Sequence, residues 1–484
     1  MGKGNRTLKD IIKVSASNVV VLLTSVLIAF ILPKIIGVED YGYYQTFTLY
    51  AAYVGLFHFG IVDGIYLVYG DKNYDQLERT KFRFYTRFLF VLEFLIALIV
   101  GVTCFFAIKD ENLQFIFICV AVYLLTYNMS GYFQFISQIT QRFKELSLRN
   151  LVQSLLNIVS LVILFLVMKY ANQVISYKIY TLIYVAIQII LMCWYIFTYR
   201  DITFGRSEKN LFKDIFSFIK VGLPLLIANL TLILILKIDR QFVDYFFKDK
   251  EIFAKYSFAY NMLALITTLT NAISTVLYPS MKRKNEFKVT EYQNLVSIIA
   301  VLIFACLLVY YPLDLFVTWF LPNYVDSLPI FRIILPGLIL TSVITIVMLN
   351  YYKVIGKNLI FFLESLGVLL LSIIANIVAY YIMPEPIAIS IASIIIIFIW
   401  YLVVEFYFIK KYKVNPIKNL SFIILGCASF YAITLIQTEY IGFLVQLAVT
   451  ILLILIYFYK DIKNILNKRK KKEVIEEDTS KNEG

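Results

Sequence analysis

The sequence of 484 residues has few of the residues on which enzymes and metal proteins most often depend. It contains one histidine, which excludes an HExxH zinc site, and it has no GxxxxGK[ST] loop for binding ATP. It has no Asp-x-Asp pair for a metal-bound sugar nucleotide, and its five cysteines form no CxxC pair. The sequence therefore predicts no metal site, no cofactor and no enzymatic activity.

Charged residues are also scarce. They make up 16% of the chain, against about a quarter in soluble proteins, and the mean hydropathy is +0.79. They gather in short clusters between apolar runs of about twenty residues, the length of a helix that crosses the hydrocarbon core of a membrane. Backbone groups in lipid must form hydrogen bonds within their own segment, so these runs are expected to be helices. The predicted fold class is an all-α polytopic membrane protein.

The apolar runs predict fourteen transmembrane helices, and no loop between them is long enough for a soluble catalytic domain. The first run is too long for the apolar region of a signal peptide and lacks a small-residue cleavage site, so it is expected to remain in the mature protein. The expected spans are 14–33, 43–69, 84–108, 113–138, 148–168, 174–198, 215–244, 252–280, 293–319, 329–352, 358–382, 385–409, 417–437 and 440–460.

Basic residues are concentrated in alternate connecting segments. Examples are Lys72 to Arg83, Lys282 to Lys288 and the run Lys468 to Lys472. The positive-inside rule places this side in the cytoplasm, so the net charge of +13 indicates topology rather than nucleic-acid binding. We expect a multi-pass protein of the bacterial cytoplasmic (inner) membrane with both termini in the cytoplasm, which agrees with an even number of spans.

Two segments that are far apart in the sequence are similar to each other. Gly37 to Tyr44 and Asp249 to Tyr256 share matching residues at one fixed offset, which corresponds to six helices. Such repeats are common in transporters, with the substrate site between the halves. They predict two pseudo-repeated six-helix lobes and two extra C-terminal helices. The expected organisation is an N-lobe at 1–199, a cytoplasmic inter-lobe loop at 200–214, a C-lobe at 215–409, two helices at 410–461 and a charged cytoplasmic tail at 462–484.

Several segments are similar to one family. They are Ser17-Asn18 through Leu32-Pro33, Gly37 to Tyr44, His58 to Gly70, Gly222-Leu-Pro224 and Ile238-Asp239-Arg240. On these segments, and in helix count over nearly the whole chain, the sequence resembles the oligosaccharide flippases (Wzx-type polysaccharide transporters) of the multidrug/oligosaccharidyl-lipid/polysaccharide exporter superfamily. One departure is Val68, where members of the family often have an arginine.

The resemblance implies a V-shaped central cavity and alternating access. It also implies a substrate, an oligosaccharide linked to polyprenyl pyrophosphate, that moves from the cytoplasmic to the outer leaflet for export of a surface polysaccharide such as capsule or O-antigen. Proteins of this family usually act as monomers. The expected partners are therefore the lipid-linked substrate, membrane lipids and a coupling cation or proton.

Polar residues recur at helical spacing in the spans 14–33 and 252–280. Spacings of three, four or seven residues place them on one face, which should turn away from lipid. We expect Asn18, Asn261 and Asn271 to bind sugar hydroxyls from these faces. The alternative is that small polar residues pack one helix against another.

A pyrophosphate in a medium of low dielectric constant must be paired with positive charge. The candidates are Lys34, Lys237, Arg240 and Arg332, all expected toward the outer side of the membrane. Snorkelling to the interface is an alternative explanation for Lys237. The sequence reveals no arginine that is clearly placed at the middle of the membrane.

Charged side chains within a span are costly and are often functional. Asp63, His58 and Asp239 are the candidates for binding a coupling proton or cation. Asp239 could instead cap a helix or form a local ion pair, and a single buried histidine is often only hydrogen-bonded.

Three other functions remain open. An exporter of small amphipathic or cationic molecules on the same scaffold would have a cavity in which carboxylates dominate. A lipid II flippase would share the polyprenyl pyrophosphate. A membrane-embedded glycosyl or acyl transferase would need an acid–base cluster and a donor site at the membrane surface, and the sequence shows neither.

Overall fold

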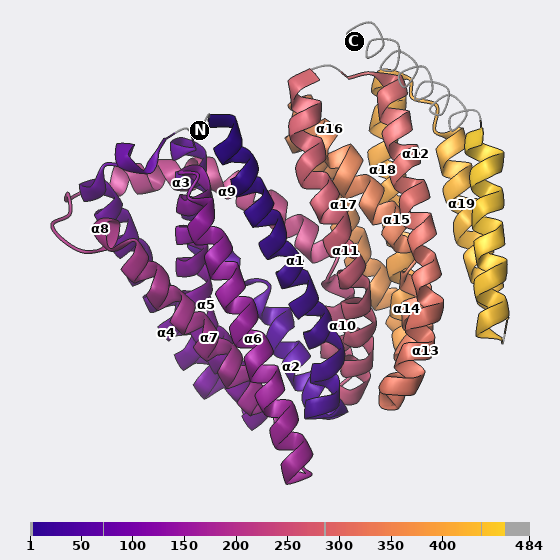
Figure 1. The fold of residues 1–484 in the computed structure, drawn as a ribbon, viewed down its shortest axis with the longest axis horizontal. Coiled ribbons are helices and arrows are strands. Elements are labelled where there is room, and N and C mark those ends of the chain that lie inside the picture. Colours follow the sequence, from indigo (N-terminus) through magenta and orange to yellow (C-terminus); the bar gives the residue numbers. More distant parts are fainter. Residues whose placement is uncertain (1–2, 71, 285–286, 437, 460–484) are drawn as a thin grey trace, which may run out of the picture. The chain divides into compact units, whose positions relative to one another are not determined.

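The computed structural model describes residues 3–70, 72–284, 287–436 and 438–459, apart from the side chains of 3–16, 268–280 and 282–284. Within these ranges the secondary structure is helical throughout, with no β-strand (Figure 1). The chain divides into two compact units. The first unit comprises Met1–Thr268, Asn323–Ser327 and Ser365–Ser393, and the second unit comprises Leu269–Pro322, Leu328–Glu364 and Ile394–Gly484.

Eleven helical segments of the described chain are long and apolar enough to cross a membrane, and a bent pair makes a twelfth. The prediction of an all-α, multi-pass membrane protein is thus confirmed, whereas the count of fourteen is not. The two other predicted spans, 252–280 and 417–437, correspond to α11 (Lys250–Lys284) and to α19 (Ile417–Ile433), which has only 17 residues.

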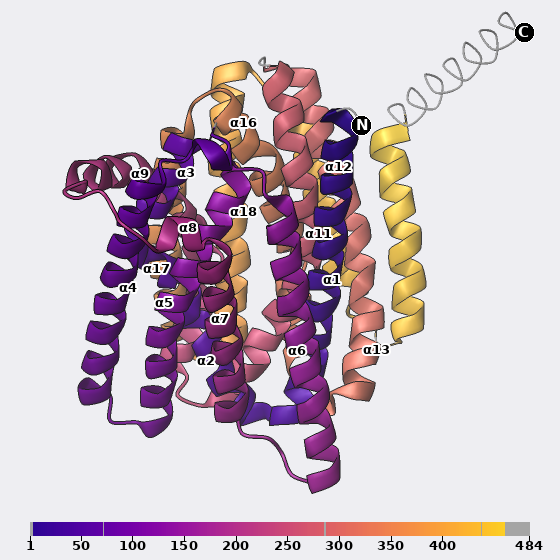
Figure 2. The ribbon, with the colours of Figure 1, turned by 60° about the vertical axis from the view of Figure 1, so that its left-hand side comes forward.

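The first unit is built around α5 (Glu111–Ile139), which packs against several neighbouring helices. Asp110 caps the N-terminus of α5, because its side chain accepts a hydrogen bond from the backbone N–H of Leu113 at 2.8 Å. Figures 1 and 2 show α1 lying along α6, and α4 lying along α5. The long helices that pack against α5 are α4 (Arg79–Ala107), α6 (Phe143–Ala171) and α7 (Tyr177–Thr198), and α1 (Lys3–Ile36) packs against α6.

The second predicted span, 43–69, is not one continuous helix. It consists of α2 (Val38–Ala51), the 3-10 helix η1 (Val54–His58) and α3 (Ile61–Tyr69), with a bend of 59°. The break occurs where Phe59 and Gly60 adopt left-handed backbone conformations, with φ of 49° and 79°. A left-handed residue ends an α-helix, and glycine adopts this conformation without strain.

The bend allows α3 to lie against α9 (Phe212–Ile235) at backbone distance. A Cβ atom at Gly60 would overlap the backbone of Gly222 and Leu223, and one at Gly64 would overlap the backbone of Phe218. Small residues permit this close approach, as they do between many membrane helices. We refer to this contact as the α3–α9 seam.

The seventh predicted span, 215–244, is also divided. Helix α9 ends at Ile235, and α10 (Ile238–Phe246) begins after Lys237, whose backbone is not helical. The division coincides with the change from an apolar run to the charged sequence Lys237-Ile-Asp239-Arg240. These charged residues therefore lie at a helix break and not on the side of a continuous helix.

The tenth predicted span, 329–352, consists of four short helical segments in the described chain. They are α14 (Ser327–Ile334), α15 (Gly337–Ser342), the π-helix η5 (Val343–Met348) and α16 (Leu349–Val354). Pro336 lies between α14 and α15 and explains the first division, because proline lacks the N–H that a helix interior requires.

Large aromatic residues form the interior of the second unit. Trp400, Tyr401 and Phe304 are buried, and the hydroxyl of buried Tyr292 donates a hydrogen bond to the carboxylate of Glu405. The remaining helices of the described chain that lie in this unit or pass through it are α12 (Val289–Cys306), η3 (Leu307–Val309), α13 (Tyr310–Phe320), η4 (Pro322–Tyr324), α17 (Asn358–Ile382), α18 (Pro386–Tyr412) and a helical span at Glu439–Tyr459.

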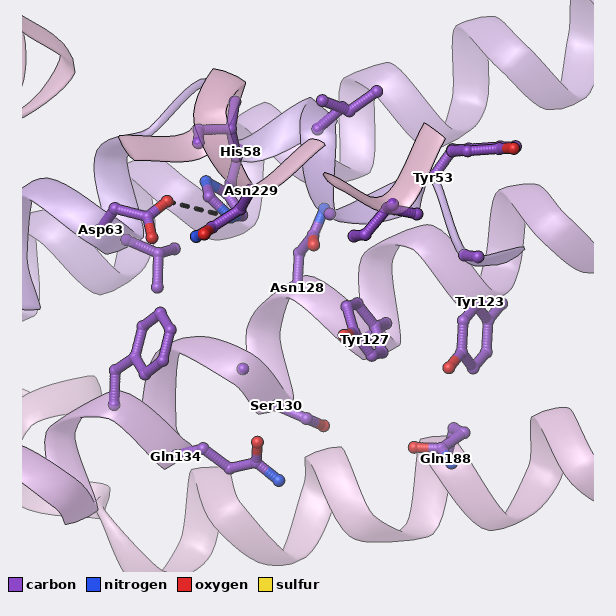
Figure 3. A pocket seen from close by; sticks show the side chains of 18 of the residues that line it. Tyr53, His58, Asp63, Tyr123, Tyr127, Asn128, Ser130, Gln134, Gln188 and Asn229 are labelled. Atoms are coloured by element: carbon purple, nitrogen blue, oxygen red, sulfur yellow. Dashed lines mark ion pairs between the residues drawn. The ribbon is translucent and has the colours of Figure 1, made fainter. Parts of the chain in front are cut away.

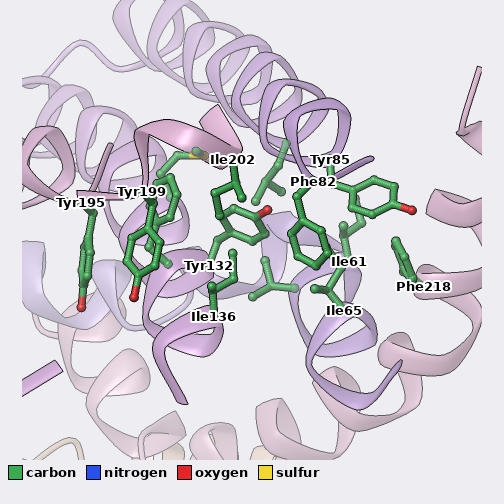
Figure 4. Packing of buried hydrophobic residues seen from close by; sticks show 14 of the residues in the cluster. Ile61, Ile65, Phe82, Tyr85, Tyr132, Ile136, Tyr195, Tyr199, Ile202 and Phe218 are labelled. Carbon is green, nitrogen blue, oxygen red and sulfur yellow. The ribbon is translucent and has the colours of Figure 1, made fainter. Parts of the chain in front are cut away.

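A buried aromatic cluster (Figure 4) occupies part of the first unit and includes Ile61, the residue that follows Gly60. It joins α3, α4, α5 and α7 with the short helix α8 (Arg200–Thr203) and the start of α9. Its members in Figure 4 interlock as rings and branched aliphatic side chains. We call it the aromatic core, and its central residues are Ile61, Ile65, Phe82, Tyr85, Tyr132, Ile136, Tyr195, Tyr199, Ile202 and Phe218.

Candidate functional site

The first unit contains a pocket of about 470 Å³. Its walls come from η1, α3, α5, α6, α7 and α9. Figure 3 shows several of the lining side chains, among them His58, Asp63, Tyr127 and Gln188. We call it the larger pocket. Its polar lining residues are Tyr53, His58, Asp63, Tyr123, Tyr127, Asn128, Ser130, Gln134, Arg149, Gln153, Tyr184, Gln188 and Asn229.

The break between η1 and α3 places His58 and Asp63 together in the wall of this pocket (Figure 3). Both residues are buried, and His58 Nε2 lies 3.7 Å from Asp63 Oδ2. The backbone N–H of Gly60 donates a hydrogen bond to His58 Nδ1 at 3.1 Å. His58 Nδ1 is therefore an acceptor, so the ring is neutral and its proton is on Nε2, toward Asp63.

Asn128 joins the pocket to a buried carboxylate. Its side-chain amide donates hydrogen bonds to Glu93 Oε2 at 2.8 Å and to the carbonyl oxygen of Val54 at 3.0 Å. Glu93 on α4 is fully buried. These bonds attach η1, and thus the break in the second span, to α4 and α5.

Five buried polar atoms in the wall have no hydrogen-bond partner among the residues that the structure describes. Buried polar groups in native proteins are almost always satisfied, so such atoms call for a ligand or for water. Their concentration in one pocket indicates a binding surface. The atoms are Tyr53 OH, Asp63 Oδ2, Asn128 Oδ1, Ser130 Oγ and Arg149 Nε.

Tyrosine rings and side-chain amides form most of the remaining wall. The ring centroids of Tyr123 and Tyr127 are 5.4 Å apart, and those of Tyr123 and Tyr184 are 5.8 Å apart. Tyr127 is 45% exposed although it lies within a membrane helix. Gln134 and Gln188 flank the same space (Figure 3). Amides both donate and accept hydrogen bonds, and aromatic faces pack on apolar surfaces.

Arg149 is the charged lining residue of the larger pocket that the sequence analysis did not identify. The span expected at 148–168 begins earlier, at Phe143, so Arg149 lies roughly 9 Å along the helix, at 1.5 Å per residue. A signal was available in the sequence, because Arg149 and Gln153 are four residues apart and share a helix face, and both line the pocket. The predicted candidates for a cation in the binding site did not include it.

A second pocket of about 330 Å³ adjoins the first. The two share Ala52, Tyr123, Tyr127, Tyr184 and Ile233 as lining residues. We call it the smaller pocket. Its charged residue is Lys237, one of the predicted substrate-binding residues, at the break between α9 and α10.

Asp239 and Arg240 form a different buried cluster in the first unit. Asp239 accepts hydrogen bonds from the hydroxyls of Tyr256 (3.1 Å), Tyr260 and Ser393 (3.2 Å), and from the backbone N–H of Arg240 (2.7 Å). The Arg240 guanidinium carbon lies 4.9 Å from the Tyr260 ring centroid. Neither charged residue lines the two pockets described above.

The other predicted substrate-binding residues lie elsewhere. Asn261 donates a hydrogen bond to the Tyr41 hydroxyl at 2.9 Å, and Asn18 and Lys34 are exposed on α1. Arg332 belongs to the second unit, where it donates to the carbonyl oxygen of Thr434 at 3.4 Å. The side chain of Asn271 lies outside the described residues.

The model of the polysaccharide biosynthesis protein family matches residues 7–285, which is more than half of the chain. The chain belongs to this family. A comparison with curated protein sequences gives no match.

Solved structures show the same fold at low sequence identity. The chain is similar to the lipid II flippase MurJ in an inward closed conformation, with a TM-score of 0.69, 16% identity and coverage of 94% of this chain and 100% of that chain. It is also similar to an inward-facing multidrug resistance MATE family transporter of the MOP superfamily, with a TM-score of 0.53, 12% identity and coverage of 89% and 100%. A MOP superfamily transporter from Pyrococcus furiosus has a TM-score of 0.50 at 12% identity, with coverage of 83% and 96%.

Family and fold together confirm the resemblance found in the sequence. The chain belongs to the polysaccharide biosynthesis protein family, and its fold is that of the lipid II flippase MurJ and of MATE family transporters.

Proposed function

We propose that this family member is a flippase for a polyprenyl-pyrophosphate-linked oligosaccharide. It moves the substrate by alternating access from the cytoplasmic to the outer leaflet of a bacterial inner membrane, for export of a surface polysaccharide such as capsule or O-antigen. The observation that supports this most strongly is the larger pocket, with its tyrosine rings, amides and unsatisfied polar atoms.

Sugars suit this lining for a physical reason. Each sugar hydroxyl both donates and accepts hydrogen bonds, as do the amides of Gln134, Gln188 and Asn229. The apolar C–H faces of a sugar ring can pack on the rings of Tyr123 and Tyr127. A volume of about 470 Å³ lies within the range of small-molecule sites.

The smaller pocket is the proposed place of the pyrophosphate. Lys237 lines it, and it shares a tyrosine wall with the larger pocket, so a substrate could occupy both at once. Lysine serves as a mobile point charge for phosphate groups. Arg240, in the Asp239 cluster next along the chain, would add to the positive field there.

The coupling ion is proposed to bind at the two buried carboxylates that the sequence singled out. Asp63 has an unsatisfied oxygen beside neutral His58, and Asp239 gathers three hydroxyl groups around one carboxylate. Oxygen-rich sites of this kind suit a proton or a small cation. We further propose that both termini are cytoplasmic and that the protein acts as a monomer.

The charges of the pockets favour this function over export of small cationic molecules. Such an exporter needs a cavity dominated by carboxylates, whereas Asp63 shares the larger pocket with Arg149 and Lys237 lines the smaller one. A lipid II flippase remains the second candidate, because the fold is similar to that of MurJ. The two differ in the group attached to the pyrophosphate, which a transport assay can vary.

Flipping by purified protein in proteoliposomes tests the proposal. We expect fluorescent polyprenyl-pyrophosphate oligosaccharide to cross the bilayer, and lipid II and an amphipathic cationic dye to cross at least tenfold more slowly. Tyr127→Ala combined with Gln188→Ala should abolish flipping. Tyr245→Ala, on an exposed side chain of α10 outside both pockets, is the matched control. Faster movement of the dye or of lipid II, or wild-type flipping by the double variant, would refute the proposal.

A further inference from the structure

Arg149 is the one arginine or lysine among the described residues that line the larger pocket. We propose that it binds a carboxylate carried by a sugar of the glycan, so that the flippase selects acidic oligosaccharides. This inference rests on the proposed function and adds a class of sugar to it.

The guanidinium group has no carboxylate partner within ion-pair distance among the described residues. Glu145, one helical turn earlier on α6, would be the natural partner, but it pairs with Arg142 at 2.8 Å. Arg149 Nη1 donates a hydrogen bond to Asn150 Oδ1 at 3.4 Å, and Arg149 Nε has no partner among the described residues. Arginine offers five N–H donors, and the hydrogen bond to Asn150 uses one of them.

The surroundings of Arg149 are neutral and suited to a sugar. The guanidinium carbon lies 6.0 Å from the Tyr195 ring centroid, and Tyr123, Tyr127 and Tyr184 are close enough to interact with it electrostatically. Gln153 lies on the same face of α6 and also lines the pocket. A cation held among aromatic rings and amides is a recognition element for one anionic group on an otherwise neutral, hydroxyl-rich ligand.

Charge balance distinguishes a carboxylate from the pyrophosphate. The charged lining residues of the larger pocket are Arg149 and Asp63, while His58 is neutral. A carboxylate has one negative charge, and one guanidinium matches it with two parallel hydrogen bonds. A pyrophosphate has more negative charge than one arginine can offset in a medium of low dielectric constant, and Asp63 would repel it. Lys237 in the smaller pocket supplies the separate positive charge that the pyrophosphate needs.

The first test varies the substrate and leaves the protein unchanged. Three fluorescent polyprenyl-pyrophosphate disaccharides, ending in glucuronic acid, in its methyl ester or in glucose, are compared in proteoliposomes of the wild-type protein. Because a hydrogen-bonded charge pair would be lost with either neutral sugar, we expect the acid to be flipped roughly tenfold or more faster than the ester and glucose. Equal rates for the three would overturn the inference.

The second test varies the protein. Arg149→Gln should lower the ratio of acidic-probe flipping to glucose-probe flipping by roughly tenfold or more. Arg149→Lys, which keeps the charge but not the paired geometry, should restore part of the preference. Equal losses for both probes in Arg149→Gln would instead assign Arg149 to the pyrophosphate or to the fold, against the inference. If wild-type protein flips none of the probes, it is the proposed function that fails.

Discussion

The larger pocket and the aromatic core of the first unit use the same kinds of side chain in opposite ways. In the core the tyrosine hydroxyls mostly have protein partners: Tyr85 donates to Asp214 Oδ2 at 2.6 Å, and Tyr199 lies 2.7 Å from Ser137 Oγ. In the pocket, the hydroxyls of Tyr53 and Ser130 have none among the described residues. Tyrosine content alone therefore does not distinguish packing from recognition.

The two regions therefore differ in whether their buried polar groups have hydrogen-bond partners within the protein. Satisfied polar groups hold helices together, whereas unsatisfied ones in a pocket reduce stability and are retained because a ligand completes them. The two regions meet at the α3–α9 seam: Ile61, Ile65 and Phe218 belong to the core, Leu226 and Asn229 line the pocket, and Val62 belongs to both. Four predictions test this contrast.

The largest effect is expected at the α3–α9 seam. Gly64→Val would place a side chain against the backbone of Phe218, and two backbones cannot separate without disturbing both core and pocket. We expect a loss of about 3 kcal/mol or more in the free energy of unfolding, with little folded protein recovered.

The matched control for this change is another helical glycine. Gly131 lines the larger pocket, and no atom lies within 4 Å of the position of an added Cβ. Gly131→Ala should leave stability unchanged or raise it by about 0.5–1 kcal/mol, because alanine favours helix. Similar recovery of the two variants in size-exclusion chromatography would contradict the seam as described.

Truncation of a core ring should have an effect of similar size. Phe82 is fully buried in the aromatic core, so Phe82→Ala should cost about 3–5 kcal/mol of unfolding free energy, measured by denaturant titration in detergent. Tyr127→Ala, in the pocket and 45% exposed, should cost less than about 1 kcal/mol and should reduce flipping much more than stability. If Tyr127→Ala were as unstable as Phe82→Ala, Tyr127 would be a packing residue like those of the aromatic core.

Removal of single hydroxyl groups sharpens the comparison. Tyr85→Phe takes a donor away from Asp214 and should cost about 1.5–3 kcal/mol, as expected for a hydrogen bond to a charged group. Tyr53→Phe breaks no hydrogen bond within the described chain, so its unfolding free energy should change by less than about 0.5 kcal/mol. The same denaturant titration compares them, and equal costs would show that the Tyr53 hydroxyl is satisfied within the protein.

The last comparison concerns Asn128, whose side chain donates hydrogen bonds to Glu93 and to the carbonyl oxygen of Val54. Glu93→Gln retains an acceptor oxygen for Asn128 and should change unfolding free energy by less than about 1 kcal/mol. Asn128→Leu leaves Glu93 and the Val54 carbonyl without their donor and should cost about 1–3 kcal/mol. Thermal unfolding of the two variants side by side measures the difference. A larger loss in Glu93→Gln would mean that the carboxylate has a partner other than Asn128.

The fold class and the family could be read from the sequence because hydropathy and short motifs report on them directly. The breaks could not, since a window of twenty residues averages across Phe59 and Gly60 and across Lys237. A glycine within an apolar run is compatible with a continuous helix. Only the structure shows that the chain bends at Gly60 and that the backbone of α9 lies too close there for a side chain. The count of spans is uncertain from sequence for the same reason.

The binding residues were only partly predictable. His58, Asp63 and Lys237 were candidates and do line pockets, because a charged residue inside a span is costly and therefore conspicuous. Arg149 was missed because basic residues near the start of a span look like topology signals, and the direction of a side chain depends on neighbouring helices. Tyr127 and Gln188 give no distinct signal, since tyrosine and glutamine at helical spacing are equally typical of packing.

The central claim is that the glycan of the substrate occupies the larger pocket. Photo-cross-linking with a polyprenyl-pyrophosphate oligosaccharide that carries a diazirine on its sugar, followed by peptide mass spectrometry, tests it most directly. We expect adducts on Tyr123, Tyr127, Gln153 or Gln188, competed by unlabelled substrate and reduced in the Tyr127→Ala, Gln188→Ala variant. Competed adducts confined to residues outside both pockets, such as the exposed face of α10, would contradict it.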